Sequence, residues 1–158
     1  MKGGEWVVFR KESIEQRLGK IEEALAVLKR HRAISRDAFL GNIETRWIVE
    51  RGLILVSECV FDIGTHILAG VFGTYPEQYK EVILNCEEKE VISKETGWRL
   101  RGLAGFRNVL VHGYLQLDPN RVYDSLQEDL PVFRDFIRDV LRWLSAEREP
   151  PGPEETPQ

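Results

Sequence analysis

Apolar residues recur at three- and four-residue steps along most of this chain, which is the spacing of one face of an α-helix. The first stripe follows Ser13, a predicted N-cap with Gln16 three residues later, and ends near His31. We therefore predict a first helix from Ser13 to His31. The preceding residues, 1–12, are expected to form an N-terminal arm that is either extended or the first turn of a helix. The stripe consists of Ile14, Leu18, Ile21, Leu25 and Leu28.

A second and longer stripe opens at Ser35 and continues to Val71. It contains no strong helix breaker, so we predict one long helix, ended by the turn at residues 73–76. Gly52 and Gly64 lower the helix propensity inside it, or allow a neighbouring helix to approach closely. The apolar members are Phe39, Ile43, Trp47, Leu53 or Ile54, Val60 or Phe61, and Leu68.

Three further helices are predicted in the second half of the chain. A short one covers Tyr79 to Cys86, and the next is capped by Ser93 or Thr96 and runs to residue 112. The last begins after Asp118, with a proline in its first turn, and is kinked or restarted at residue 131. Helices joined by short loops predict an all-α fold, an up-and-down bundle of four to five helices over residues 13–146. The proline-rich tail, residues 147–158, is expected to be disordered.

Composition narrows the functional classes. The 158 residues carry 22 basic and 26 acidic side chains, a net charge of -4, so the chain is not a globally basic nucleic-acid binder. Any RNA contact must come from a local patch, which Arg99, Arg101 and Arg107 are able to form. The only two cysteines, Cys59 and Cys86, lie in apolar surroundings and are expected to be reduced core thiols. No uninterrupted apolar run approaches a membrane span and no signal peptide is visible, so we expect a cytoplasmic protein with no membrane partner.

The residues from Arg107 to Tyr114 carry the most chemistry. Arg107 offers a planar fork of donors for phosphate, and His112 exchanges a proton near neutral pH. An anion binder beside a proton carrier is the minimum that is needed to cleave a phosphodiester without a metal ion. The two lie five positions apart, well off a common helical face. They converge only if the helix ends near His112, which Gly113 favours, or if a second copy of the chain supplies one of them.

Each of these side chains also has a structural interpretation. Arg107 is equally suited to a surface ion pair, and His112 to capping the end of its helix. Asn108 is able to orient the histidine, to bind phosphate, or to tie the helix end to a neighbour. Tyr114 is a candidate RNA contact or a core residue. Asp62 and His66 share a helical face four residues apart, but a third metal ligand is not evident, so a buried polar pair, or a contact that supports the active site indirectly, is favoured.

The pattern as a whole resembles the HEPN-domain superfamily, and within it the HepT-like ribonuclease toxins. The motif Arg107-x4-His112-x-Tyr114, with Asn108 after the arginine, is similar to the signature of that family. The likeness extends from about Ile14 to Leu144. Its other parts are residues 47–51 and 58–68, similar to the family's long second helix, residues 105–114, similar to its active-site helix end, and residues 129–131, similar to the start of its last helical stretch.

This resemblance implies a metal-independent endoribonuclease without a cofactor, with Arg107 and His112 as catalytic residues and Asn108 and Tyr114 in support. It implies a homodimer that brings two motif copies to one cleft, and an RNA substrate attacked by its own 2′-hydroxyl. It also implies a cognate nucleotidyltransferase antitoxin that transfers AMP to Tyr114. From the residues alone, a non-catalytic helical module that binds a nucleotidyltransferase remains the alternative.

Overall fold

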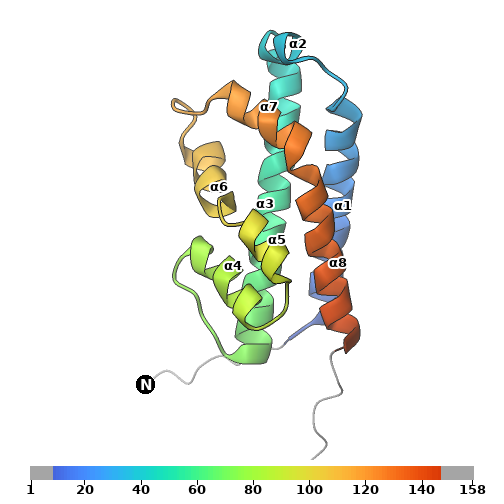
Figure 1. The fold of residues 1–158 in the computed structure, drawn as a ribbon, viewed down its shortest axis with the longest axis vertical. Helices are drawn as coiled ribbons and strands as arrows, with labels where there is room; N and C mark the ends of the chain where they lie inside the picture. The colour runs from blue at the N-terminus through green and yellow to red at the C-terminus, as the bar shows by residue number, and fades with distance from the viewer. Residues whose placement is uncertain (1–8, 147–158) are drawn as a thin grey trace, which may run out of the picture.

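The computed structural model describes residues 9–146, and within that range the chain forms eight α-helices and no strand. Three long helices run along the molecule's long axis: α1 (Lys11–His31), α3 (Ile43–Phe72) and α8 (Leu130–Ala146) (Figure 1). The prediction of an all-helical bundle is therefore confirmed. The shorter helices are α2 (Arg36–Leu40), α4 (Tyr79–Glu88), α5 (Lys94–Arg99), α6 (Leu103–His112) and α7 (Pro119–Glu128).

Helix α3 is the centre of the bundle. It packs against α1 on one side and against α4 and α6 on another, and α2 and α7 also contact it. By length and composition α3 is apolar enough to cross a membrane, but half of its most apolar window is buried inside the protein. The apolar character of α3 is therefore explained by the core that it forms with the surrounding helices. Cys59 of α3 and Cys86 of α4 are buried in that core as free thiols.

Two helix starts differ from the sequence-based prediction. Helix α1 begins at Lys11, with Arg10 as N-cap, so Ser13 lies in the first turn and does not cap the helix. The Ser13 hydroxyl instead accepts a hydrogen bond from Arg17 at 2.6 Å. The predicted long second helix is interrupted after α2, because the Asn42 side chain accepts a hydrogen bond from the backbone N–H of Thr45 and starts α3 as a new helix.

The predicted fourth helix is also two helices. Ser93 caps α5, accepting from the Thr96 backbone N–H at 3.1 Å, but α5 ends at Arg99 and α6 starts only at Leu103. The later boundaries agree better with the sequence. Asp118 caps α7 with a proline in its first turn, and the chain restarts as α8 at Leu130.

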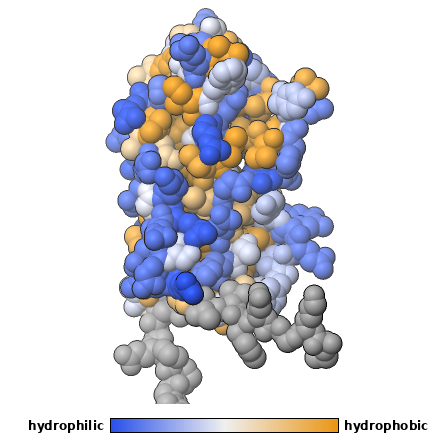
Figure 2. Space-filling model, turned by 180° about the vertical axis from the view of Figure 1, so that it is seen from behind, coloured by the Kyte–Doolittle hydropathy of each residue, from blue (hydrophilic) through white to orange (hydrophobic). Residues whose placement is uncertain are grey.

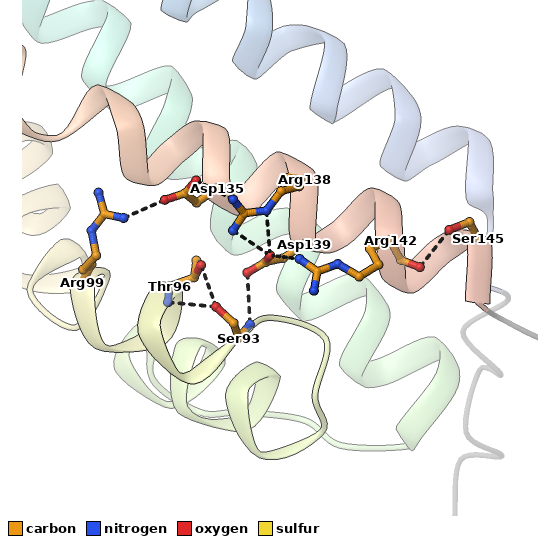
Figure 3. A network of polar contacts seen from close by, with 8 residues as sticks. All are labelled: Ser93, Thr96, Arg99, Asp135, Arg138, Asp139, Arg142 and Ser145. Carbon is orange, nitrogen blue, oxygen red and sulfur yellow. Dashed lines mark hydrogen bonds and ion pairs between the residues drawn. The ribbon is translucent and has the colours of Figure 1, made fainter.

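A polar network fastens α5 to α8 (Figure 3). Asp139, which is only 3% exposed, accepts hydrogen bonds from the Ser93 backbone N–H and from the guanidinium groups of Arg138 and Arg142. Arg99 reaches Asp135 on α8 at 2.6 Å. Both ends of α5 are thereby tied to α8, which gives the segment leading into α6 a defined position.

The described part of the N-terminal arm lies against the lower end of the bundle. The Phe9 ring stacks on the His66 ring with centroids 5.8 Å apart, and its edge meets Trp143 at 5.9 Å. The Arg10 backbone N–H donates to Nε2 of His66 at 3.1 Å. Residues 1–8 and 147–158 fall outside the described range, so the conformation expected for the rest of the arm and the disorder expected for the tail stay predictions.

Candidate functional site

An open cleft of about 1030 Å³ lies between α4 and α6 and reaches Thr65 of α3. The residues just before α4 and its first turn form one wall, and α6 with the loop before it forms the other. Three residues of the sequence motif line this cleft: Arg107, Asn108 and His112. The structure therefore brings together the two side chains that the sequence singled out for phosphodiester chemistry.

The guanidinium group of Arg107 is held in place from two sides. Its Nε donates to the Glu58 carboxylate of α3 at 2.6 Å, and its Cζ lies 4.7 Å from the centre of the Tyr79 ring. Its Nη1 donates to Asn108 Oδ1 at 3.3 Å. Only 12% of the Arg107 side chain is exposed, so the ion pair with Glu58 is partly shielded from water. Arg107 thus does form an ion pair, as the structural interpretation expected, but the pair lies at the cleft.

These contacts leave part of the guanidinium free for a ligand. Arginine has five N–H donors, and Glu58 and Asn108 engage two of them. Within the described range, Nη2 makes no hydrogen bond. A guanidinium anchored through Nε keeps its outer edge for bidentate contact with a phosphate. Asn108 orients the arginine, and no described contact links it to His112.

His112 is the last residue of α6 and is exposed at the cleft. Gly113 is the C-cap, so the expected end of the helix at this point is confirmed. This end is what allows residues five positions apart to share one cleft. Tyr114 follows immediately and is 78% exposed, so it is not the core residue that was considered as an alternative.

The side chains that line the cleft include more cations than carboxylates, although the whole chain has a net charge of -4. Its lining includes Lys80, Arg101 and Arg107, against the single carboxylate of Glu77. Of the three arginines expected to form a basic patch, Arg99 is turned to Asp135 on α8. The patch therefore consists of Arg101 and Arg107 together with Lys80, which the sequence did not single out.

Asp62 and His66 do not form the expected buried polar pair. Asp62 is exposed and faces Arg17 at 3.7 Å, whereas His66 accepts from Arg10. Glu58 and Tyr79, which hold Arg107, were missed as functional residues. Glu58 was visible as an acid inside an apolar helix, but its partner lies 49 residues away, and a single sequence gives no sign of that pairing.

Comparison with known proteins gives a consistent family. A family model described as "Ribonuclease HepT-like" matches residues 21–140. The tRNA nuclease HepT of Aphanizomenon flos-aquae (strain 2012/KM1/D3) is 30% identical over 131 residues, which cover 83% of this chain and 89% of that protein. The putative RNase YutE of Bacillus subtilis (strain 168) is 24% identical over 140 residues, covering 89% and 93% of the two chains.

Solved structures share the fold. YutE from Bacillus subtilis, described as a cytosolic protein of unknown function, superposes with a TM-score of 0.76 at 25% identity over 92% of this chain and 98% of its own. The tri-AMPylated HEPN toxin of Shewanella oneidensis, solved in complex with MNT antitoxin, gives a TM-score of 0.76 at 20% identity over 84% of this chain and 99% of that one. The resemblance read from the sequence is confirmed: the chain belongs to the HepT-like ribonuclease family and has the HEPN fold.

Proposed function

We propose that this chain is a metal-independent endoribonuclease that acts as the toxin of a toxin–antitoxin pair. The observation that carries the proposal is that Arg107, anchored by Glu58, and His112 line the same cleft. Arg107 neutralises charge on the scissile phosphate, which is worth most in a site partly shielded from water. His112 exchanges the proton that the reaction requires.

The reaction follows from these roles. The 2′-hydroxyl of the substrate attacks the adjacent phosphorus and loses its proton, while the bond to the 5′-oxygen of the next nucleotide breaks. The leaving oxygen takes up a proton, so the products are a 2′,3′-cyclic phosphate and a 5′-hydroxyl. His112 serves as the base for the first proton or the acid for the second, and the guanidinium of Arg107 pairs with the non-bridging oxygens throughout.

A homodimer explains how both proton transfers are served. One cleft holds one His112, and a second copy would bring a second histidine. The outer face of α3 offers the interface, because Trp47, Ile48 and Leu55 line an apolar groove against α1 and lie on the same helical face as Glu58. Trp47 and Ile48 are 63% and 42% exposed, and apolar side chains gather on the upper half of the molecule seen from behind (Figure 2). Glu58 follows Leu55 by three residues on α3, so an interface at this groove would lie close to the Glu58–Arg107 pair.

The regulatory partner is a nucleotidyltransferase antitoxin in the cytoplasm. Solved relatives include a HEPN toxin that is tri-AMPylated and bound to MNT antitoxin. Tyr114 fits a modification site because it is 78% exposed and follows His112 by two residues. An AMP group on its hydroxyl would add bulk and negative charge beside the cleft and oppose RNA binding.

The test is cleavage of total RNA in excess EDTA, with analysis of the product ends. The wild type is expected to leave 2′,3′-cyclic phosphates, and Arg107→Ala and His112→Ala to remain folded without cleaving. His31→Ala is a matched control, because His31 also ends a helix, α1, but does not line the cleft. Undiminished cleavage by both site variants would show that neither Arg107 nor His112 takes part in the reaction. A wild type that binds a nucleotidyltransferase but neither cleaves RNA nor arrests growth would favour the non-catalytic module.

A further inference from the structure

Trp98 is an exposed aromatic side chain beside the cleft that the proposed chemistry leaves unused. It lies on α5 and is 66% exposed. The guanidinium carbon of Arg101 stands 4.6 Å from the centre of its ring. Arg101 also lines the cleft, whereas Trp98 does not. The pair therefore links the cleft, through a cation, to an aromatic surface outside it.

The two residues are presented from a firmly held segment. Ser93, at the start of α5, donates to Asp139, and Arg99, at its end, pairs with Asp135 (Figure 3). Arg101 itself is only weakly engaged, since its nearest carboxylate, that of Glu87, is 4.0 Å away and half of its side chain is exposed. The segment that carries Trp98 and Arg101 is thus held in place, while the charge of Arg101 remains available to a ligand.

The surrounding charge favours a nucleic acid as the ligand. Lys80 lies in the opposite wall of the cleft, and Arg107 lies further along α6, so cations follow the cleft from Arg101 to the proposed site of cleavage. A positively charged groove with an exposed aromatic residue is the combination that binds single-stranded RNA, because cations follow the phosphates while bases stack on the ring. A base inside a duplex has both faces covered and is unable to stack in this way.

The length of α6 gives the spacing. Its ten residues, from Leu103, two positions after Arg101, to His112, span about 15 Å at 1.5 Å per residue. At 3.4 Å per stacked nucleotide this corresponds to about four nucleotides. We propose that Trp98 and Arg101 form a stacking platform for an unpaired base a few nucleotides from the cleaved bond. The substrate class is then RNA that is single-stranded on at least one side of the cleavage site, an inference that rests on the proposed ribonuclease function.

Binding and cleavage of defined oligonucleotides test the platform. In a His112→Ala background, which prevents turnover, Trp98→Ala is expected to weaken binding of a single-stranded octanucleotide by about 5- to 150-fold, the range for loss of one base–aromatic stack. Trp98→Phe keeps an aromatic face and is expected to recover most of the affinity. Leu141→Ala removes another exposed apolar side chain, on α8, and is expected to bind as the parent.

Substrate length separates the platform from the chemistry. In the catalytically intact protein, Trp98→Ala is expected to lower kcat/KM for the octanucleotide far more than for a dinucleotide, mainly through KM. Equal losses on both substrates, or unchanged binding of the octanucleotide, would overturn the platform, as would a defect confined to binding of the nucleotidyltransferase. Failure of the wild type to cleave total RNA would refute the ribonuclease, yet a Trp98-dependent binding loss in the His112→Ala background would still support the platform.

Discussion

Glu58 is predicted to position Arg107, and its removal should damage both stability and catalysis. Glu58→Ala deletes the carboxylate that receives Arg107 Nε at 2.6 Å. The guanidinium then keeps its burial, with only 12% of its side chain exposed, but loses the counter-charge that compensates for it. A partly buried charge left without its partner is costly, so the arginine is expected to move toward solvent and away from its aligned position.

The structure sets the size of the effect. Two unit charges about 4 Å apart attract by about 1 kcal/mol in water and about 4 kcal/mol at an effective dielectric constant of 20. Glu58 is 33% exposed, so the pair falls between these limits, and a hydrogen bond to a charged group is worth about 1.5–3 kcal/mol. We expect Glu58→Ala to lower the free energy of unfolding by about 1–3 kcal/mol. Misplacement of the guanidinium should reduce kcat by about 10- to 100-fold.

Urea unfolding and RNA cleavage measure the two effects, and Asp62→Ala supplies the control. Asp62 follows Glu58 by one helical turn, but its 3.7 Å pair with Arg17 is exposed and should be worth less than about 1 kcal/mol, without effect on cleavage. Glu58→Gln should fall between Glu58→Ala and the wild type and keep the shape of the pH–rate profile. Equal destabilisation by Glu58→Ala in wild-type and Arg107→Ala backgrounds would show that the two residues are not coupled and refute the reasoning.

Three further predictions concern packing, pH and modification. Gly64→Ala places a methyl group 2.5 Å from Val82 Cγ1, so it should lower stability by about 1–3 kcal/mol and reduce cleavage by shifting α4, whereas Gly19→Ala, with nothing within 4 Å, should not. Burial lowers the pKa of His66 in the folded state. The neutral His66 should therefore stabilise the fold above about pH 6.5, the pKa of histidine in the unfolded chain, and this stabilisation should be lost as the pH falls through the lower pKa of the folded state. Urea unfolding at pH 7.5 and 5.0 should show a smaller effect of pH on stability in His66→Gln than in the wild type. Incubation with the partner antitoxin and ATP should add AMP to Tyr114, and mass spectrometry should find the adduct absent from Tyr114→Phe.

Local rules account for most of the helices but not for all of their boundaries. The apolar stripes identified every long helix, and the Asp118 cap and the restart at Leu130 followed from turn chemistry. The two predicted long helices that prove to be interrupted share one cause. A three- to four-residue apolar pattern continues across a short break, because residues on both sides of the break face the same core, so periodicity alone does not reveal the cap at Asn42.

The site was predictable only in part, for a related reason. Arg107 and His112 belong to one local motif, so their chemistry is readable from neighbouring residues. Glu58, Tyr79 and Lys80 come from α3 and α4, and only the packing of those helices on α6 brings them to the cleft. Side chains that position a functional group across helices leave no spacing in the sequence, because the distance along the chain between them has no fixed relation to the distance in space.

The five-residue separation of Arg107 and His112 shows how one helix serves two roles. Successive residues turn by about 100°, so the two side chains leave α6 on different faces. Arg107 faces α3 and α4, where Glu58 and Tyr79 hold it, and His112 reaches the same cleft because the helix stops there. The arginine is therefore rigid and partly buried, whereas the histidine is exposed at an open edge. That division suits a fixed phosphate anchor and a proton carrier that must approach the attacking or the leaving oxygen. It also leaves the exposed edge as the side from which a second subunit would complete the site.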